Sequence, residues 1–266
     1  MNIIVTIKQV PDPDIPPNHF KVDEAAKRVI APPGVAPVMN GYDANALEAA
    51  LRLKEEHGGK VTALSLGTAE ARDTLKRSIA MGADEAVLLD DPALLDGDSY
   101  TTALALAKAI GKIGAYDLVL CGRQASDTDA GQVALGIGEL LGLPTVSPAI
   151  GLELANGSLK VNRMIEDGYQ VLEVPLPALV AVSSEIAEPR YPPLRGIMAA
   201  GRAQIPVWSA ADLGLGASDV GAAGRKVAVR RLYVETRETR CELIEGDSPA
   251  EAGAALAQRL RDAKLI

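Results

Sequence analysis

Short apolar segments alternate with longer segments of helical periodicity through about residue 146, and this alternation constrains the fold more than any other feature. The apolar segments carry almost no polar side chains, which indicates strands that are buried on both faces. Such strands are predicted at 2–7, 61–66, 86–89 and 118–121, and another begins at 145. Buried strands that alternate with helices are typical of a parallel sheet covered by helices, so the predicted fold class is α/β.

Residues that favour helix ends lie between these strands. Asp98 is suited to begin a helix, and Gly142 follows the last apolar position of another. Ligands of parallel α/β sheets bind at the carboxyl ends of the strands. The loops that follow Ile7, Leu66 and Cys121 are therefore the region in which a binding site is predicted.

After residue 150 the pattern changes. Residues 152–161 are predicted to form a hairpin around Asn156-Gly157, because Asn-Gly favours tight turns between strands. Residues 163–172 resemble a further pair of strands, and 179–182 form one more apolar strand.

From residue 183 on, the alternation stops. Residues 188–196 are rich in proline and are predicted to be irregular, whereas 226–234 is a strand-like run. Ser248-Pro249 is predicted to begin a final helix that reaches about residue 264. A long stretch with little core of its own is unusual in a compact domain, so we expect it to pack on another chain.

The composition argues against several classes of function. A formal net charge of −8 disfavours nonspecific nucleic-acid binding, which needs clustered lysine and arginine. The cysteines and histidines show no metal-ligand spacing, and no pair of residues is suited to act as nucleophile and base. No signal peptide and no membrane-spanning apolar run is apparent, so we expect an intracellular protein without direct membrane insertion. Redox chemistry would need a bound cofactor.

The strongest candidate site is the polar loop at 122–133, which lies between a buried strand and a predicted helix. A helix N-terminus offers free amide donors and partial positive charge to a phosphate group. Arg123 can add charge-assisted hydrogen bonds, and Gly122 and Gly131 permit close backbone approach to a ligand. The loop therefore suits a nucleotide.

The alternative for this loop is that Asp127 or Asp129 is an ordinary helix cap and the loop is merely solvated. The loop is not a Walker motif, because GxxxxGK[ST] does not occur. No GxGxxG follows the first strand, which disfavours ordinary NAD binding.

Two further segments are candidates. Residues 40–43 either cap the following helix, through Asn40 and Asp43, or line a pocket for an adenosine group. Residues 188–200 are either a proline-rich surface loop or a surface that binds a partner. The second reading rests on four apolar side chains in a segment predicted to lack regular structure: Tyr191, Leu194, Ile197 and Met198.

Together these motifs resemble the beta-subunit family of electron-transfer flavoproteins over nearly the whole chain. The matching segments, in order, are 3–12, 40–43 with 48–54, 80–84, 122–127 and 188–191. The resemblance implies a Rossmann-like domain, similar to adenine nucleotide alpha hydrolases, in a heterodimer whose alpha subunit holds most of an FAD. It implies an electron carrier rather than an enzyme with substrate turnover of its own.

As such a carrier, the protein would accept electrons from dehydrogenases, such as acyl-CoA dehydrogenases, and pass them to a downstream oxidoreductase. The expected location is the cytoplasm, or the mitochondrial matrix in a eukaryote. The resemblance divides the chain into a nucleotide-binding α/β domain at 1–182 and, at 183–266, a recognition loop and C-terminal arm that pack on the partner subunit.

The family usually buries one AMP in the beta subunit. Carried over by position, the implied cofactor-binding residues are Thr6, Asn40, Gly41, Tyr42, Asp43, Leu66, Gly122, Arg123, Gln124, Asp127, Thr128, Asp129, Ala130, Gly131, Gln132 and Val133. The implied partner-binding residues are Glu188, Pro189, Arg190, Tyr191, Leu194, Ile197 and Met198, with Leu194 at the position of the family's anchoring leucine.

Three departures leave alternatives open. Gly41 stands where AMP-binding members often have proline, and Pro13 stands near the position of an aromatic residue that approaches the flavin in some relatives. The run from Asp127 to Val133 also resembles electron-bifurcating relatives, which bind a second FAD in place of AMP and oxidise NADH, although Ala130-Gly131 replaces the Thr-Ala common in their loop. A nucleotide sensor of the universal-stress type is a third possibility, but the C-terminal arm and the segment at 188–191 argue against it.

Overall fold

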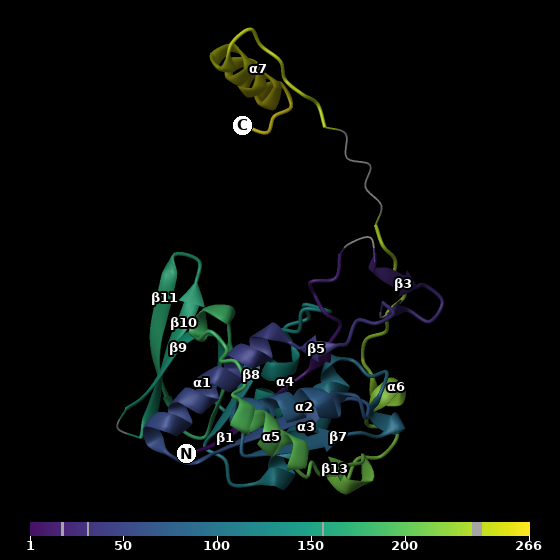
Figure 1. The fold of residues 1–266 in the computed structure, drawn as a ribbon, viewed down its shortest axis with the longest axis vertical. Coiled ribbons are helices and arrows are strands. Elements are labelled where there is room, and N and C mark those ends of the chain that lie inside the picture. The colour runs from purple at the N-terminus through teal and green to yellow at the C-terminus, as the bar shows by residue number, and fades with distance from the viewer. Residues whose placement is uncertain (17–18, 31, 156, 236–240) are drawn as a thin grey trace.

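The computed structural model describes residues 1–16, 19–30, 32–155, 157–235 and 241–266. Within these residues one nine-stranded sheet forms the centre of the molecule, in the order β11-β10-β9-β12-β8-β1-β6-β7-β13 (Figure 1). The strands from β9 to β13 in this order are parallel, and β10 and β11 extend the sheet in antiparallel fashion. The predicted α/β fold with a parallel sheet is confirmed.

The bounds of the strands agree with the predicted apolar segments in the first half of the chain. The parallel strands are β1 (Asn2–Thr6), β6 (Lys60–Leu66), β7 (Glu85–Leu89), β8 (Leu118–Gly122), β9 (Thr145–Ala155), β12 (Ala178–Val182) and β13 (Val207–Trp208). Two small pairs lie outside the sheet: β2 (Gln9–Val10) with β5 (Val38–Met39), and β3 (Lys21–Asp23) with β4 (Arg28–Ile30).

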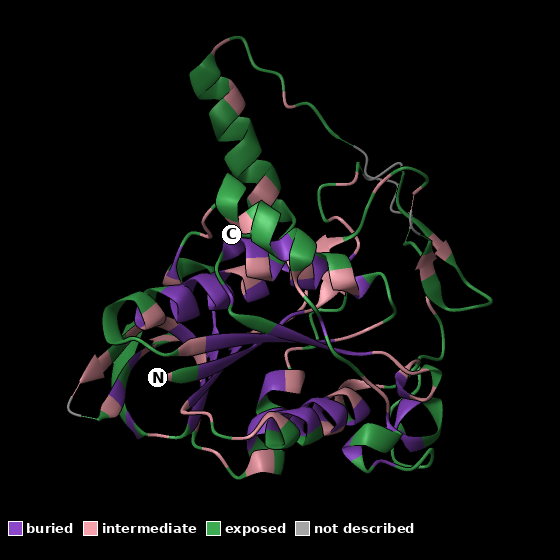
Figure 2. Cartoon of the chain, turned by 60° about the horizontal axis from the view of Figure 1, so that its bottom comes forward, coloured by how far each residue is buried: buried purple, intermediate pink, exposed green. Residues whose placement is uncertain are grey.

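Helices cover both faces of the sheet, as predicted. Ile3 and Val5 of β1 pack in one apolar cluster with α1 (Gly41–His57) and α2 (Ala71–Met81). Ile4 points to the other face, where it packs with α3 (Ser99–Ile113) and α4 (Val133–Leu141). Successive side chains of a strand point to opposite faces, so β1 is buried on both sides. Figure 2 shows the resulting buried layer in the sheet and on the helices beside it.

In the antiparallel part of the sheet, the strands begin and end at different residues from those predicted. β9 runs without a break through the residues assigned to the first strand of the hairpin, and β10 (Ser158–Ile165) and β11 (Gly168–Pro175) complete a three-stranded meander. β9 and β10 pair antiparallel, as the predicted hairpin requires, whereas Asn156 itself lies outside the described residues. Pairing along the whole edge satisfies more backbone groups than two separate hairpins would.

Two predictions for the last third of the chain are wrong. Residues 188–196, predicted to be irregular, run into α5 (Leu194–Arg202), which packs on α2. Pro193 precedes its first turn, where a missing N–H removes no helical hydrogen bond. Residues 226–234, predicted as a strand, form none; the N–H groups of Lys226 and Val227 donate to Asp98 Oδ2 at 2.5 and 2.8 Å instead.

Residues 184–224 contribute more core than their sequence indicated. Ala187, Ile205 and Val220 are buried against the sheet or its helices, and β13 joins the edge of the sheet beside β7. Short helices complete this region: η3 (Ser184–Ile186), η4 (Ala211–Leu213) and α6 (Gly221–Gly224), with η2 (Pro92–Leu94) beside α6. The weakly packed part of the chain therefore begins after Gly224.

The final helix, α7 (Pro249–Asp262), is confirmed with its predicted start. Ser248 Oγ accepts the N–H of Glu251 at 3.2 Å, and Pro249 occupies the first turn. Nevertheless α7 has no buried residue and lies away from the sheet and its covering helices (Figure 1). No helix in the described part of the chain has both the length and the apolar character needed to span a membrane.

Candidate functional site

The carboxyl ends of three neighbouring parallel strands bring the predicted site residues to one edge of the sheet. Thr6 ends β1, Leu66 ends β6 and Gly122 ends β8. β1 lies between the other two strands, so Leu66 and Gly122 are separated by about 10 Å, two strand spacings. Thr6 is buried and Leu66 is partly exposed.

Asp43, in the first turn of α1, joins the loops that follow β1 and β8. Its Oδ2 accepts the N–H of Lys8 at 2.8 Å, and its Oδ1 accepts the N–H of Gly122 at 3.0 Å. Burial raises the pKa of Asp43 to about 7, although hydrogen bonds from Lys8, Asn40 and Gly122 oppose that shift. The carboxyl group therefore holds the two loops and α1 in fixed relative positions.

Asn40, immediately before α1, holds a second point of the same loop. It is fully buried, and its Nδ2 donates to the carbonyl of Gln124 at 2.8 Å while its Oδ1 accepts the N–H of Ser126 at 3.2 Å. Asn40 is the N-cap residue of α1, but its side chain makes no capping bond to the helix, so the capping alternative does not account for this side chain. Its amide instead fixes the backbone of the 122–133 loop.

The two glycines of this loop have different roles. A Cβ on Gly122 would overlap Asp43 Oδ1 and would lie 2.7 Å from Tyr42 Cβ, so its missing side chain allows α1 to approach β8. Gly131 has φ +62°, which L side chains rarely adopt, and a Cβ there would meet only the Arg123 carbonyl, at 3.7 Å. Of the two predicted approach points for a ligand, only Gly131 leaves space.

Charged side chains at the loop are mostly paired. Lys8 Nζ contacts both carboxylate oxygens of Asp127 at 2.7 Å, and Gln124 Nε2 donates to Asp129 Oδ1 at 2.8 Å. Lys8 was not among the predicted site residues, although its place directly after β1 at the ligand edge is a signal that could have identified it. Its contact with Asp127 joins the loops after β1 and β8 on their solvent side.

Three features of the loop fit a bound anionic group. Arg123 lies over the Tyr42 ring, 5.2 Å from the ring centre, and its Nε is buried without a hydrogen-bond partner. α4 begins at Val133, and the side chain of its N-cap, Gln132, makes no capping bond. The first amides of α4 are therefore free of side-chain acceptors, next to a glycine with open space. The loop residues 126–130 are exposed, which leaves the site open to a nucleotide.

The predicted partner-binding residues divide into two groups. Tyr191 and Leu194 are 90% and 75% exposed, and Ile197 and Met198 are also exposed. Because Leu194, Ile197 and Met198 are spaced by three and four residues on α5, they share one face of the helix. Arg190 points the other way and binds α1 of its own chain.

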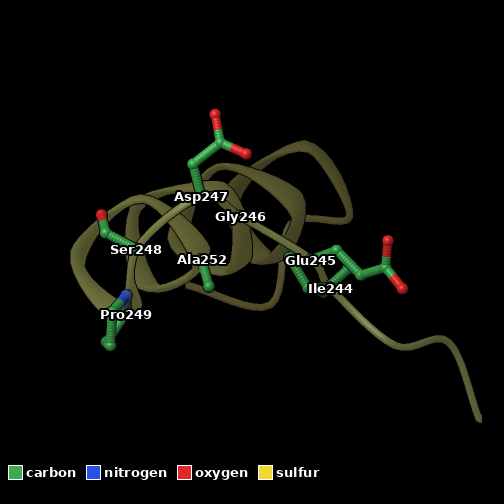
Figure 3. Close-up of a pocket in the computed structure, with 7 residues that line it drawn as sticks. All are labelled: Ile244, Glu245, Gly246, Asp247, Ser248, Pro249 and Ala252. Carbon is green, nitrogen blue, oxygen red and sulfur yellow. The ribbon is translucent and has the colours of Figure 1, made fainter.

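A hollow on the arm is not a second candidate. It is lined by residues at the start of α7, from Ile244 to Ala252, away from the sheet edge. The polar side chains of Glu245, Asp247 and Ser248 point in different directions and do not converge (Figure 3). Convergent polar groups are what a small-molecule site needs.

Neither the buried Cys121 nor a cluster of metal-ligating side chains adds a second site in the described residues. Cys121 lies in β8, and burial raises the pKa of its thiol to about 12, so it stays protonated at neutral pH. Among the residues that the structure describes, no group of three or more His, Cys, Asp or Glu side chains is placed to hold a metal ion.

Known proteins resemble this chain over its full length. Residues 28–213 match the family model described as electron transfer flavoprotein domain. The chain is 40% identical to the electron transfer flavoprotein subunit beta of Thermoanaerobacterium thermosaccharolyticum and 37% identical to the caffeyl-CoA reductase-Etf complex subunit CarD of Acetobacterium woodii, with all of each chain covered. It is also 37% identical to protein FixA of Azorhizobium caulinodans, over 97% of this chain and 93% of that one.

Proposed function

The chain belongs to the beta-subunit family of electron-transfer flavoproteins, and from this premise we propose that it is the AMP-binding half of an electron carrier. Membership implies association with flavin and an alpha subunit as partner. The finer proposal is that the alpha subunit holds most of the FAD, that this chain binds AMP as a structural ligand, and that dehydrogenases deliver electrons to the heterodimer.

The observation that carries the nucleotide proposal is the combination of an unpartnered Arg123 Nε, the uncapped start of α4 and the open Gly131 at one sheet edge. In the proposed site, Arg123 and the amides from Gly131 to Val133 bind the phosphate. Gly41 and Tyr42, which are more exposed than Asn40 and Asp43, line the adenosine side. Asn40 and Asp43 hold the loops in place.

The remaining implied nucleotide residues would complete this pocket: Thr6 and Leu66 at the strand ends, with Gln124, Asp127, Thr128, Asp129 and Ala130 in the loop. When bound, FAD supplies the electron-transfer chemistry. The residues of this chain would bind the nucleotide, keep the sheet edge rigid and present the surface at 188–200 to a dehydrogenase.

A second candidate function is the electron-bifurcating form, with a second FAD in place of AMP and NADH as the donor. It is favoured by the run from Asp127 to Val133, which resembles the corresponding loop of bifurcating relatives. The site described above can accept the phosphate of either nucleotide, so the bound species decides between the two functions.

The deciding experiment is to purify the chain with its alpha subunit, denature the complex, and identify the released nucleotides by chromatography and mass. We expect FAD and AMP in equal amounts. Two FAD per heterodimer without AMP would replace the carrier with the bifurcating form, and an absence of nucleotide beyond the FAD of the alpha subunit would refute a site in this chain.

The same assay tests the loop directly. Asp127→Ala removes the partner of Lys8 and loosens the contact between the loops after β1 and β8. We expect AMP content and heterodimer stability to fall, with AMP occupancy reduced about tenfold if about 1.4 kcal/mol of binding free energy is lost. Asp167→Ala, at the exposed turn between β10 and β11, is the matched control. Full retention of AMP in Asp127→Ala would argue against this loop as the site.

The surface at 188–200 is proposed to bind the dehydrogenase. Leu194→Ala removes an exposed side chain that touches little of its own chain, so folding and flavin content should not change. We expect electron transfer from a partner dehydrogenase to slow about tenfold when the heterodimer concentration is limiting. Loss of a side chain that anchors an interface has an effect of this size. Leu140→Ala on α4, also exposed, should have no effect. Unchanged transfer in Leu194→Ala would remove the basis of this assignment.

We also propose that the C-terminal arm packs on the alpha subunit. Residues 225–235 and 241–266 are mostly exposed, and α7 buries no residue on its own chain. A helix of 14 residues has little stability alone in water, so a partner surface is the simplest support for it.

A further inference from the structure

Arg190 is held by two carboxylates of α1. Its Nε donates to Glu48 Oε2 at 2.7 Å and its Nη2 to Glu48 Oε1 at 3.1 Å. Its Nη1 donates to Glu55 Oε1 and its Nη2 to Glu55 Oε2, the latter at 3.1 Å. The backbone N–H of Arg190 also donates to Glu48 Oε2, at 3.2 Å. We call Arg190, Glu48 and Glu55 the α1 clamp.

The geometry of the clamp depends on the helix and on the guanidinium group. Glu48 and Glu55 are seven residues apart, about two helical turns, so both carboxylates lie on one side of α1. The planar fork of arginine can bind both carboxylates with paired bonds, which a lysine ammonium cannot reproduce. The Glu48 side chain is only 4% exposed, so its charge needs this partner.

The clamp holds one end of the proposed docking surface. Arg190 directly precedes Tyr191 and lies four residues before Leu194, the first residue of α5, and both of these side chains point to solvent. Just before Arg190, the carbonyl of Ala187 accepts a 2.7 Å hydrogen bond from Asn45 Nδ2, also on α1.

The other end of the surface is held by α2. A Cβ on Gly196 would overlap the carbonyl oxygen of Ala80, so α5 lies directly against α2, and Ala200 is buried. Two helices therefore fix the backbone on both sides of four outward apolar side chains. Ordering a loose segment on binding costs affinity, so a surface fixed beforehand binds more tightly.

We infer that the α1 clamp is a positioning device for dehydrogenase docking: Arg190 acts through Tyr191 and Leu194, and does not itself contact the dehydrogenase. The inference rests on the proposed docking function of residues 188–200. It gives Glu48 and Glu55, neither of which was among the predicted site residues, a role in recognition.

The test uses the purified heterodimer carrying Arg190→Lys. Hydrogen exchange of the amides at 194–202 should become about tenfold faster, because the segment loses one anchor. With an acyl-CoA dehydrogenase that reduces the wild-type heterodimer, KM for the heterodimer as electron acceptor should rise about tenfold while kcat stays within about twofold. Arg52→Lys is the control, since Arg52 also bonds Glu48, at 2.8 Å, but lies on α1 itself. It should change neither quantity.

A double variant separates positioning from direct contact. If Arg190 acts through the docking side chains, Arg190→Lys should raise KM less in the Leu194→Ala background than in the wild type. Fully additive effects, or unchanged exchange at 194–202 in Arg190→Lys, would overturn the inference. If Leu194→Ala raises KM and Arg190→Lys does not, the inference fails while the docking function stands. If neither variant changes KM, the docking function itself fails.

Discussion

Two buried carboxylates on α1, Asp43 and Glu48, have opposite pKa shifts. Burial dominates at Asp43 and raises its pKa to about 7. Burial acts in the same direction at Glu48, but hydrogen bonds from Arg190 and Arg52 outweigh it and hold the pKa of Glu48 below its ordinary value. The difference follows from the partners, because Glu48 bonds two guanidinium groups and Asp43 bonds mainly neutral amide donors.

The raised pKa of Asp43 predicts a pH-dependent stability. Between pH 3.8 and about 7, the folded protein holds a proton at Asp43 that the unfolded chain has released. The free energy of unfolding contributed by this group therefore falls as pH rises through this range, by at most about 1.4 kcal/mol per pH unit, and is level above it.

Thermal unfolding of the heterodimer at a series of pH values tests this expectation, with Asp43→Asn as the comparison. The amide cannot titrate, so the melting temperature of the wild type should fall relative to that of the variant between pH 5 and pH 7. If the melting temperatures of the two proteins changed in parallel between pH 5 and pH 7, Asp43 would not titrate in this range. Glu48 does not obscure this range, because its lowered pKa confines its own effect to pH below about 4.5.

At the scale of the element, α5 has one face against α2 and the other in solvent. Gly196 lies on the packed face, where a Cβ would overlap the Ala80 carbonyl, whereas a Cβ on Gly201 would meet nothing within 4 Å. The two glycines share one helix of nine residues, so they form a matched pair.

We expect Gly196→Ala to destabilise the heterodimer by about 1–3 kcal/mol, because α5 must move away from α2. Gly201→Ala should be neutral, or stabilising by up to about 1 kcal/mol, because alanine favours helix. Denaturant unfolding of both variants measures the difference. Equal effects of the two substitutions would mean that α5 does not pack on α2 as described.

At the scale of the whole molecule, the sheet with its helices and the C-terminal arm differ in what stabilises them. The sheet is buried on both faces by its own helices, while α7 has only exposed or partly exposed residues. Hydrophobic burial is the main source of stability, so the body can hold its structure without α7 and the arm depends on other surfaces.

Deletion of 241–266 should therefore leave the body folded but weaken assembly. The truncated chain is co-expressed with a tagged alpha subunit, and the amount that co-purifies with the tag is measured. At equal expression we expect this amount to drop about tenfold or more, because a large element of the interface is lost. The circular dichroism of the truncated chain should keep the signal of a mixed α/β fold. Undiminished recovery with the alpha subunit would contradict the proposed role of the arm.

Elements whose causes are local could be predicted from the sequence alone. The period of apolar residues separated strands from helices through residue 146, and the ends of helices followed from single residues. Asp98 accepts the N–H of Thr101 at 3.0 Å, and Ser248 accepts that of Glu251, as their positions predicted. Such contacts span three residues, so the sequence nearby contains all that decides them. The strand ends that form the candidate site were predictable for the same reason.

Contacts between distant segments could not be predicted from the sequence, because they depend on how the elements pack. Arg190 reaches Glu48 across 142 residues and Glu55 across 135, and Lys8 reaches Asp127 across 119. The order of the strands and the packing of α5 on α2 bring these residues together. Neither can be predicted from the spacing of apolar residues within a segment. For the same reason the sequence could not show that Gly122 makes room for α1 while Gly131 leaves room for a ligand, because a glycine's role depends on which atoms face it.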